Sequence, residues 1–124
     1  IQIFLDKNLI NDSLVLNTAT VFSPYGSYYK MLIDTTTLCF INIYFDIVEI
    51  ERLKLIDEIN KSNKSFVEID ELYDLTVTKL NFIRKRYFKE VESGTNIEAM
   101  HKWNMYVLNN LDIDNFRIFN IQVK

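Results

Sequence analysis

The segment that determines the fold class is residues 38–60, LCFINIYFDIVEIERLKLIDEIN, in which the hydrophobic pattern changes at Asp46. In residues 38–45 apolar side chains occur on both faces of a period-of-two pattern, which indicates a buried central strand. From Asp46 onward apolar residues recur near helical spacing, with charges on the other side. Asp46 and Glu49 form a capping-box pattern, so we expect a helix from Asp46 to Asn60. A strand followed by a helix predicts an α+β fold.

Two further strands are predicted upstream of this segment. Residues 14–22 are rich in Val, Thr and Leu, and residues 28–34 alternate between apolar and polar side chains. Residues 23–26 (SPYG) supply a turn between them, with proline at the second position and glycine at the fourth. Because the connections are short, we expect these strands and residues 38–45 to form an antiparallel meander.

Residues 66–92 fit two interpretations. Residues 66–69 and 73–78 alternate strictly and contain β-branched side chains, which favours strands. The same region also contains a stripe at helical spacing, which would favour a helix. That stripe consists of Ile69, Leu72, Val77, Leu80, Ile83, Tyr87 and Val91. We favour strands, which gives five or six strands in all when the C-terminal strand described next is counted.

The C-terminal third is predicted to contain a helix and a strand. Thr95 and Glu98 form a second capping-box pattern after Ser93 and Gly94, so a helix is expected from Asn96 to about Asn110. Its apolar stripe is Ile97, Met100, His101, Asn104, Val107, Leu108 and Leu111. Residues 116–123 alternate as a terminal strand would. The whole chain, residues 1–124, is thus expected to form one α+β domain, an antiparallel β-meander with helices packed on one face.

The composition is that of a globular protein. The chain has 124 residues, of which 48% are hydrophobic and 25% charged, and its net charge is −3. This charge is too small for general attraction to nucleic acid or anionic lipid. The single cysteine, Cys39, fits a reducing compartment, and no apolar run is long enough to span a bilayer. We therefore expect a soluble, cytoplasmic protein without membrane contact. Because the chain starts at Ile1, a complete domain and a fragment of a longer protein both fit.

The charges are polarised along the chain, which is an indication about partners. Residues 46–74 contain nine acidic and four basic side chains, whereas residues 79–89 contain five basic side chains and no acidic one. An acidic helix face and two aromatic residues off the last helix's main stripe give candidate protein-binding residues. These are Glu51, Asp57, Glu58, Asp70, Glu71, Trp103 and Tyr106. A basic and aromatic segment gives an alternative, nucleic-acid-binding set, consisting of Lys79, Arg84, Lys85, Arg86 and Lys89.

The sequence offers little for catalysis or for a cofactor. The only glycines, Gly26 and Gly94, do not form a phosphate-binding loop. Cys39 and His101 could pair as thiolate and base, but a buried cysteine in the core is the stronger interpretation. These two residues are also too few for a zinc site. An acidic cluster in residues 68–74 fits a solvated turn better than a cation site. We therefore predict no catalytic, cofactor or metal-binding residues.

The predicted order of elements resembles that of type III secretion chaperone-like domains, including YbjN-type regulatory proteins. The resemblance covers roughly residues 14–111 and includes an I-N-x-x-N turn motif at Ile59–Asn63 (INKSN) after the predicted helix. The strand-like tail after Asp112 and the basic residues 84–89 depart from that pattern. The resemblance implies a non-catalytic protein that binds extended polypeptide or regulates a partner, often as a dimer.

These observations lead to two hypotheses from different classes. The first is a non-enzymatic protein-binding module of a chaperone-like, regulatory or immunity type, with another protein as partner. That partner would be a basic protein or a second copy of the chain, since acidic surfaces complement basic ones. The alternative is a nucleic-acid-binding protein that uses residues 79–89.

Overall fold

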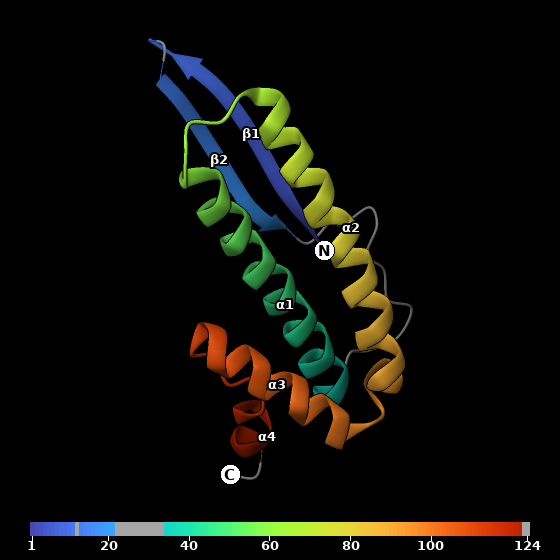
Figure 1. Ribbon diagram of the computed structural model, residues 1–124. Coiled ribbons are helices and arrows are strands. Elements are labelled where there is room, and N and C mark those ends of the chain that lie inside the picture. Colours follow the sequence, from blue (N-terminus) through green and yellow to red (C-terminus); the bar gives the residue numbers. More distant parts are fainter. Residues whose placement is uncertain (12, 22–33, 123–124) are drawn as a thin grey trace.

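Two long antiparallel helices form the centre of the molecule (Figure 1). The structure, a computed structural model, describes residues 1–11, 13–21 and 34–122. Helix α1 spans Thr35–Asn60 and helix α2 spans Phe66–Glu90. A hairpin of strands β1 (Gln2–Ile10) and β2 (Ser13–Val21) packs at the α1–α2 turn end of this pair. The remaining elements pack at the other end. They are the 3-10 turn η1 (Glu92–Gly94) and helices α3 (Ile97–Leu111) and α4 (Arg117–Gln122).

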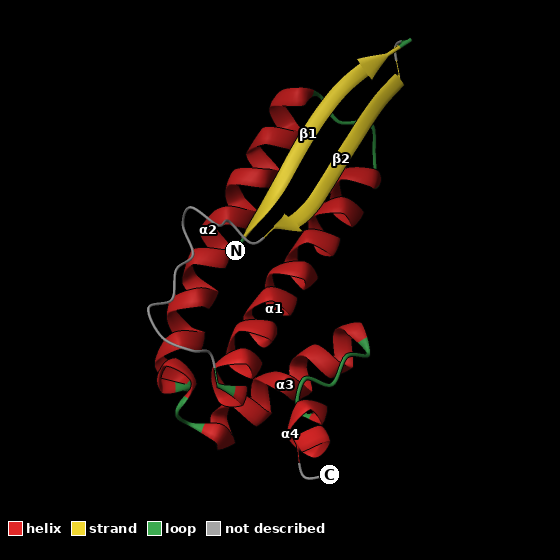
Figure 2. Ribbon diagram, turned by 180° about the vertical axis from the view of Figure 1, so that it is seen from behind, coloured by secondary structure: helices red, strands yellow, loops and turns green. Residues whose placement is uncertain are grey.

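The hairpin is the sheet of this α+β fold. Its strands are antiparallel, with a register that runs from Gln2 opposite Val21 to Ile10 opposite Ser13. Strand β2 confirms the strand predicted at residues 14–22 as far as Val21, whereas β1 was not predicted. Helices α1 and α2 lie against the same face of the hairpin (Figure 2). Among the described residues the sheet has two strands, so the larger meander is not confirmed.

Helix α1 corrects the prediction for residues 38–45, which are helical rather than a strand. The helix begins eleven residues before Asp46, because the Asp34 carboxylate accepts a hydrogen bond from Thr37 N at 2.7 Å and caps it there. Asp46 therefore lies inside the helix and does not cap it. The first half of α1 is apolar on nearly all sides. A helix with this pattern is buried, and α2, α3 and α4 pack around this one. The predicted end at Asn60 is confirmed.

Helix α2 corrects the favoured strand interpretation of residues 66–92 and confirms the helical alternative. Ser65 and Glu68 form a capping box at its start, with Glu68 N donating to Ser65 Oγ at 3.2 Å. Within the stripe that the sequence offered for a helix, Ile69, Leu80 and Tyr87 are buried. The β-branched residues of this segment favour a strand, but the segment is helical because the apolar stripe of the helix packs against α1.

The apolar side chains form two clusters, one at each end of the helix pair. The first lies between the start of α1, the end of α2, α3 and α4, and includes Ile43, Tyr87 and Met100. The second lies between the end of α1, the start of α2 and the hairpin, and includes Ile3 and Ile69. Since α1 and α2 pass through both clusters, they connect the two ends of the molecule.

The C-terminal elements confirm one prediction and correct two. Helix α3 confirms the predicted helix, but its N-cap is Asn96, whose Oδ1 accepts from Ala99 N at 3.0 Å. Thr95 instead donates its hydroxyl to Glu92 O at 2.8 Å. The predicted terminal strand at residues 116–123 is wrong, because Arg117–Gln122 form α4, which packs against α1.

Two further expectations concern a turn and a strand in residues 23–34 and the absence of a membrane-spanning segment. The strand expected at residues 28–34 and the turn at residues 23–26 lie outside the described residues, apart from Asp34. In the part of the chain that is described, no helix combines the length and apolar content that a membrane span requires.

Candidate protein-binding surfaces

A groove lies where α1, α2 and α3 meet. Its main hollow has a volume of about 440 Å³ and is open to solvent on one side. Ile83, Trp103 and Tyr106 supply apolar and aromatic surface, and charged side chains form the rest of the lining. These charged residues are Glu51, Lys54, Lys79, Arg86, Glu90 and Lys102. We call this site the interhelical groove. It contains four cations and two carboxylates.

Glu51 is the buried charge of the interhelical groove, with only 3% of its surface exposed. One carboxylate oxygen lies 3.4 Å from Lys54 Nζ and the other lies 3.0 Å from Lys79 Nζ. A buried carboxylate is costly unless it is paired, so the two lysines satisfy Glu51 and link α1 to α2. Partial burial disfavours the charged form of Lys54, but Glu51 and Tyr106 outweigh it and raise the Lys54 pKa.

The aromatic end of the interhelical groove is built on α3. The Arg86 guanidinium lies over the Trp103 ring, 5.4 Å from its centroid, and also donates to Glu90 at 2.9 Å. Trp103 in turn meets the buried Tyr87 ring edge-on at 5.3 Å, and Tyr106 packs edge-on against Trp103. Lys102 stands at the rim, and within the described part of the chain it is in no ion pair. One uncompensated cation therefore borders an aromatic surface.

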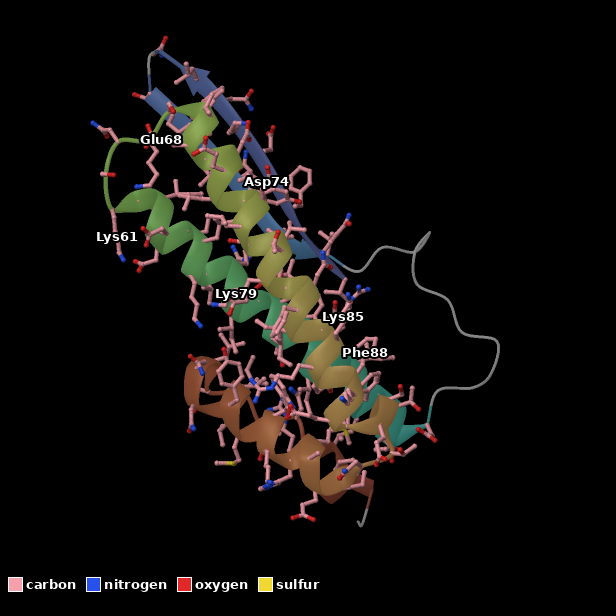
Figure 3. All side chains as sticks on the ribbon, turned by 45° about the vertical axis from the view of Figure 1, so that its right-hand side comes forward. Lys61, Glu68, Asp74, Lys79, Lys85 and Phe88 are labelled. Atoms are coloured by element: carbon pink, nitrogen blue, oxygen red, sulfur yellow. The ribbon has the colours of Figure 1, made fainter. Side chains whose placement is uncertain are left out.

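The groove continues between α1 and α2 toward their connecting turn. A second hollow of about 240 Å³ shares Glu51, Lys54 and Lys79 with the first and extends to Glu58 and Leu75. Figure 3 shows Lys79 on the side of α2 that lies next to α1, and Lys85 on the side away from it. The two hollows therefore adjoin each other at Glu51, Lys54 and Lys79.

The candidate protein-binding residues are only partly brought together. Glu51, Glu58, Trp103 and Tyr106 line the interhelical groove and its continuation. Asp57 borders a separate hollow beside Leu53 and Asn110 on α1 and α3.

The two acidic candidates on α2 lie elsewhere. Asp70 accepts from Lys7 on the hairpin at 2.6 Å, and Glu71 is exposed on α2 near Leu75. The acidic candidate residues therefore do not share one helix face. They lie on two helices, and within each helix they lie on different sides.

The basic residues of the nucleic-acid alternative are distributed around α2. Lys79 and Arg86 face the interhelical groove and are engaged in ion pairs. Arg84 lies on another side of the helix, close enough to the Ile1 amino group to lower its pKa, although burial contributes more to that shift. Lys85 and Lys89 are exposed. Helical geometry separates consecutive residues by about 100°, so the cluster in the sequence is not a cluster in space. The nucleic-acid hypothesis stays a prediction.

Within the described residues, Cys39 and His101 are not joined by a hydrogen bond and have different neighbours. Cys39 is fully buried, and its thiol donates to Asn115 O at 3.6 Å. Burial, together with the Asp114 charge, raises the Cys39 pKa to about 11. His101 is exposed and meets the Phe116 ring edge-on. In residues 1–11, 13–21 and 34–122, no three His, Cys, Asp or Glu side chains are grouped as a metal site would require.

The sequence interpretation missed several residues of these surfaces. Lys54, Ile83, Glu90 and Lys102 line the interhelical groove but lie far apart in the sequence. Leu75 was also missed as a surface residue, although it lies seven residues before Phe82 on the charged side of a helical pattern. The comparisons with known protein families, curated proteins and solved structures found no match to this chain. The resemblance to secretion chaperone-like domains thus stays a prediction.

Proposed function

We propose that this chain is a non-enzymatic protein-binding module, of a chaperone-like, regulatory or immunity type, whose interhelical groove receives a short segment of a partner protein. The observation that carries the proposal is the combination of an open hollow, an aromatic wall and Lys102, which is in no ion pair with any residue that the structure describes. Aromatic side chains in concave sites supply most of the affinity of protein interfaces, and nearby charges orient the bound segment.

The charges of the groove favour a segment that carries a carboxylate. Around the main hollow the cations exceed the carboxylates by two, and Glu51 is already satisfied by Lys54 and Lys79. An acidic side chain of the partner would pair with Lys102, and a neighbouring aromatic or aliphatic side chain would pack on Trp103 and Ile83. The sequence pattern favoured a basic partner, whereas the groove favours an acidic segment.

Site-directed photo-crosslinking in the native host tests this proposal. A photoreactive phenylalanine analogue in place of Tyr106 should give a discrete crosslinked protein, and Lys102→Glu should abolish that product. The matched control places the same analogue at Met105, which is exposed on α3 but does not line the groove. Equal products from both positions, or a product that survives Lys102→Glu, would contradict the proposal.

The same experiment addresses the nucleic-acid alternative. A crosslinked product that is removed by nuclease but not by protease would support nucleic-acid binding instead. Trp103 is the only tryptophan, so its fluorescence offers a direct titration signal once a partner peptide has been mapped.

A further inference from the structure

The outward face of α2 carries two large apolar side chains that are largely exposed in the part of the molecule that the structure describes. Phe82 is 76% exposed and Leu75 is 67% exposed. They lie seven residues apart, with Thr78 between them, and this spacing of three and then four residues is that of a helix–helix seam. Single exposed apolar residues need no explanation, but two in register along one helix form the start of an interface.

The charges along this seam are arranged with opposite signs at its two ends. Glu71 and Asp74 lie toward the N-terminal end of α2, and Lys85 and Lys89 lie toward its C-terminal end. All four are exposed, and within the described residues none of the four is in an ion pair. In this they differ from the cations of the interhelical groove that Glu51 and Glu90 already neutralise. Figure 3 labels two of them, Asp74 and Lys85, and both lie on the side of α2 that is away from α1.

We propose that this face binds the same face of a second copy of the chain, with the two α2 helices antiparallel. An antiparallel arrangement about a twofold axis places the acidic end of each helix against the basic end of the other. When the axis crosses the outward face of α2 at the level of residue 80, Glu71 of one copy lies opposite Lys89 of the other, and Thr78 lies opposite Phe82. Leu75 then contacts the aliphatic stem of Lys85. A parallel arrangement would place like charges together, so the charge pattern selects the antiparallel one.

The seam borders the continuation of the interhelical groove at Leu75, but its charged residues Glu71, Asp74, Lys85 and Lys89 line neither hollow of the groove. Substitutions at these four residues therefore test the dimer without altering the groove that is proposed to bind a partner segment. Because one helix pair buries a modest area, the dimer should dissociate on dilution, and added salt should weaken it by screening the attraction between the acidic and basic ends of the two helices.

A charge-swap experiment tests the proposal by analytical ultracentrifugation. The full chain should sediment as a dimer at high concentration, whereas Lys85→Glu with Lys89→Glu should be monomeric, as should Glu71→Lys with Asp74→Lys. An equimolar mixture of the two double variants should restore the dimer, because one copy then carries only negative and the other only positive seam charges. A wild-type chain that is monomeric at every concentration, or a dimer that both double variants retain, would overturn the proposal.

Engineered cysteines test the orientation. Glu71→Cys mixed with Lys89→Cys should form an intermolecular disulfide under mild oxidation, whereas Glu71→Cys alone should not. Cys39 will not interfere, because it is fully buried. Equally fast crosslinking of Glu71→Cys to itself would exclude the antiparallel register. Phe82→Ser, at a side chain that makes little contact within its own copy, should weaken the dimer at least tenfold and leave the helical content unchanged.

Discussion

Phe40 is the residue around which the junction of α2 and α3 is built. The Tyr87 ring stacks on it at 5.2 Å with an interplanar angle of 9°, and the Tyr87 hydroxyl donates to Phe40 O at 2.7 Å. On its other side Phe40 meets Gly94, which has φ +100° and no side chain to collide with the ring. The missing side chain of Gly94 is therefore as necessary to this contact as the aromatic rings.

Gly94→Ala should destabilise the protein by about 1–3 kcal/mol. A Cβ at this position would lie 3.1 Å from Phe40 Cβ, and the positive φ would be strained for any L-residue in addition. Urea unfolding followed by circular dichroism measures the free energy of unfolding. Ser93→Gly is the control, since Ser93 is exposed with φ 55° and glycine relieves strain there, so its effect should stay within about 1 kcal/mol. Equal losses in both variants would contradict the role given to Phe40.

The Cys39 thiol should make the protein less stable in alkaline solution. Burial raises its pKa from 9.0 to about 11, so the unfolded chain loses the thiol proton at a lower pH than the folded one. The folded state then binds more protons, and the free energy of unfolding falls as pH rises. Between pH 9 and pH 11 this loss should amount to about 2 kcal/mol.

Cys39→Ala isolates the thiol's contribution. The Tyr87 pKa is raised mainly by burial, which has the same sign and remains in the variant, and to a smaller extent by the Cys39 charge, which the substitution removes together with the thiol. Denaturant titrations at several pH values should therefore show a shallower alkaline decline for Cys39→Ala than for the wild type. Parallel pH profiles would show that the thiolate is not disfavoured in the fold.

At the scale of elements, the N-caps determine where the long helices begin. Asp34 starts α1 and Ser65 starts α2, and each side chain accepts from an amide of the first turn. The pattern at Asp46 and Glu49 is similar, but the chain is already helical there. Asp46 instead accepts from Asn115 Nδ2 at 2.8 Å, which ties α1 to the loop before α4. Asn104 on α3 holds the same loop by accepting from Asn115 N at 2.8 Å.

Ser65→Ala should destabilise the protein by about 1 kcal/mol, because it removes the side-chain acceptor of the α2 capping box. Thermal or urea unfolding measures this loss, and the first turn of α2 should show faster amide hydrogen exchange. Ser62→Ala is the matched control in the same turn, since Ser62 is exposed and its hydroxyl only accepts from Lys64. If both variants are as stable as the wild type, the capping box contributes nothing to α2.

At the scale of the whole molecule, two apolar clusters share the same pair of helices. The hairpin contacts the apolar cluster at the α1–α2 turn end through Ile3, and it also makes polar contacts with α1 and α2. The Tyr73 hydroxyl donates to Ile3 O at 3.1 Å, and the Thr20 hydroxyl donates to Glu49 at 2.6 Å. Because α1 and α2 are continuous through both clusters, neither end can lose its helices without loosening the other.

Ile69→Ala, in the cluster beneath the hairpin, should therefore also lower the stability of the cluster around Trp103. Loss of a fully buried isoleucine typically costs about 2–5 kcal/mol. Trp103 fluorescence reports on the far cluster, and circular dichroism reports on all helices. Both signals should shift to the same lower denaturant midpoint, as a two-state transition requires. A Trp103 transition that stays at the wild-type midpoint would show that the two ends unfold independently.

Local sequence signals were sufficient for helix α3, for the end of α1 and for strand β2. Helix α3 was predicted because its stripe of Met100, Asn104 and Val107 and its polar start allow few alternatives, and the end of α1 at Asn60 follows from the polar residues after it. Strand β2 was predicted from its β-branched residues.

Tertiary packing fixed the structure of the segments whose hydrophobic pattern fits both periods. Residues 38–45 are apolar on all sides, and such a short run does not distinguish a buried strand from a buried helix. They are helical because α2, α3 and α4 surround them and because the Asp34 cap begins the helix upstream. Packing also assembled the interhelical groove from three helices, and it turned Leu75 and Phe82 to the outside of α2. Residues distant in the sequence meet only when burial of both apolar clusters fixes the positions of the helices, which no short window of sequence contains.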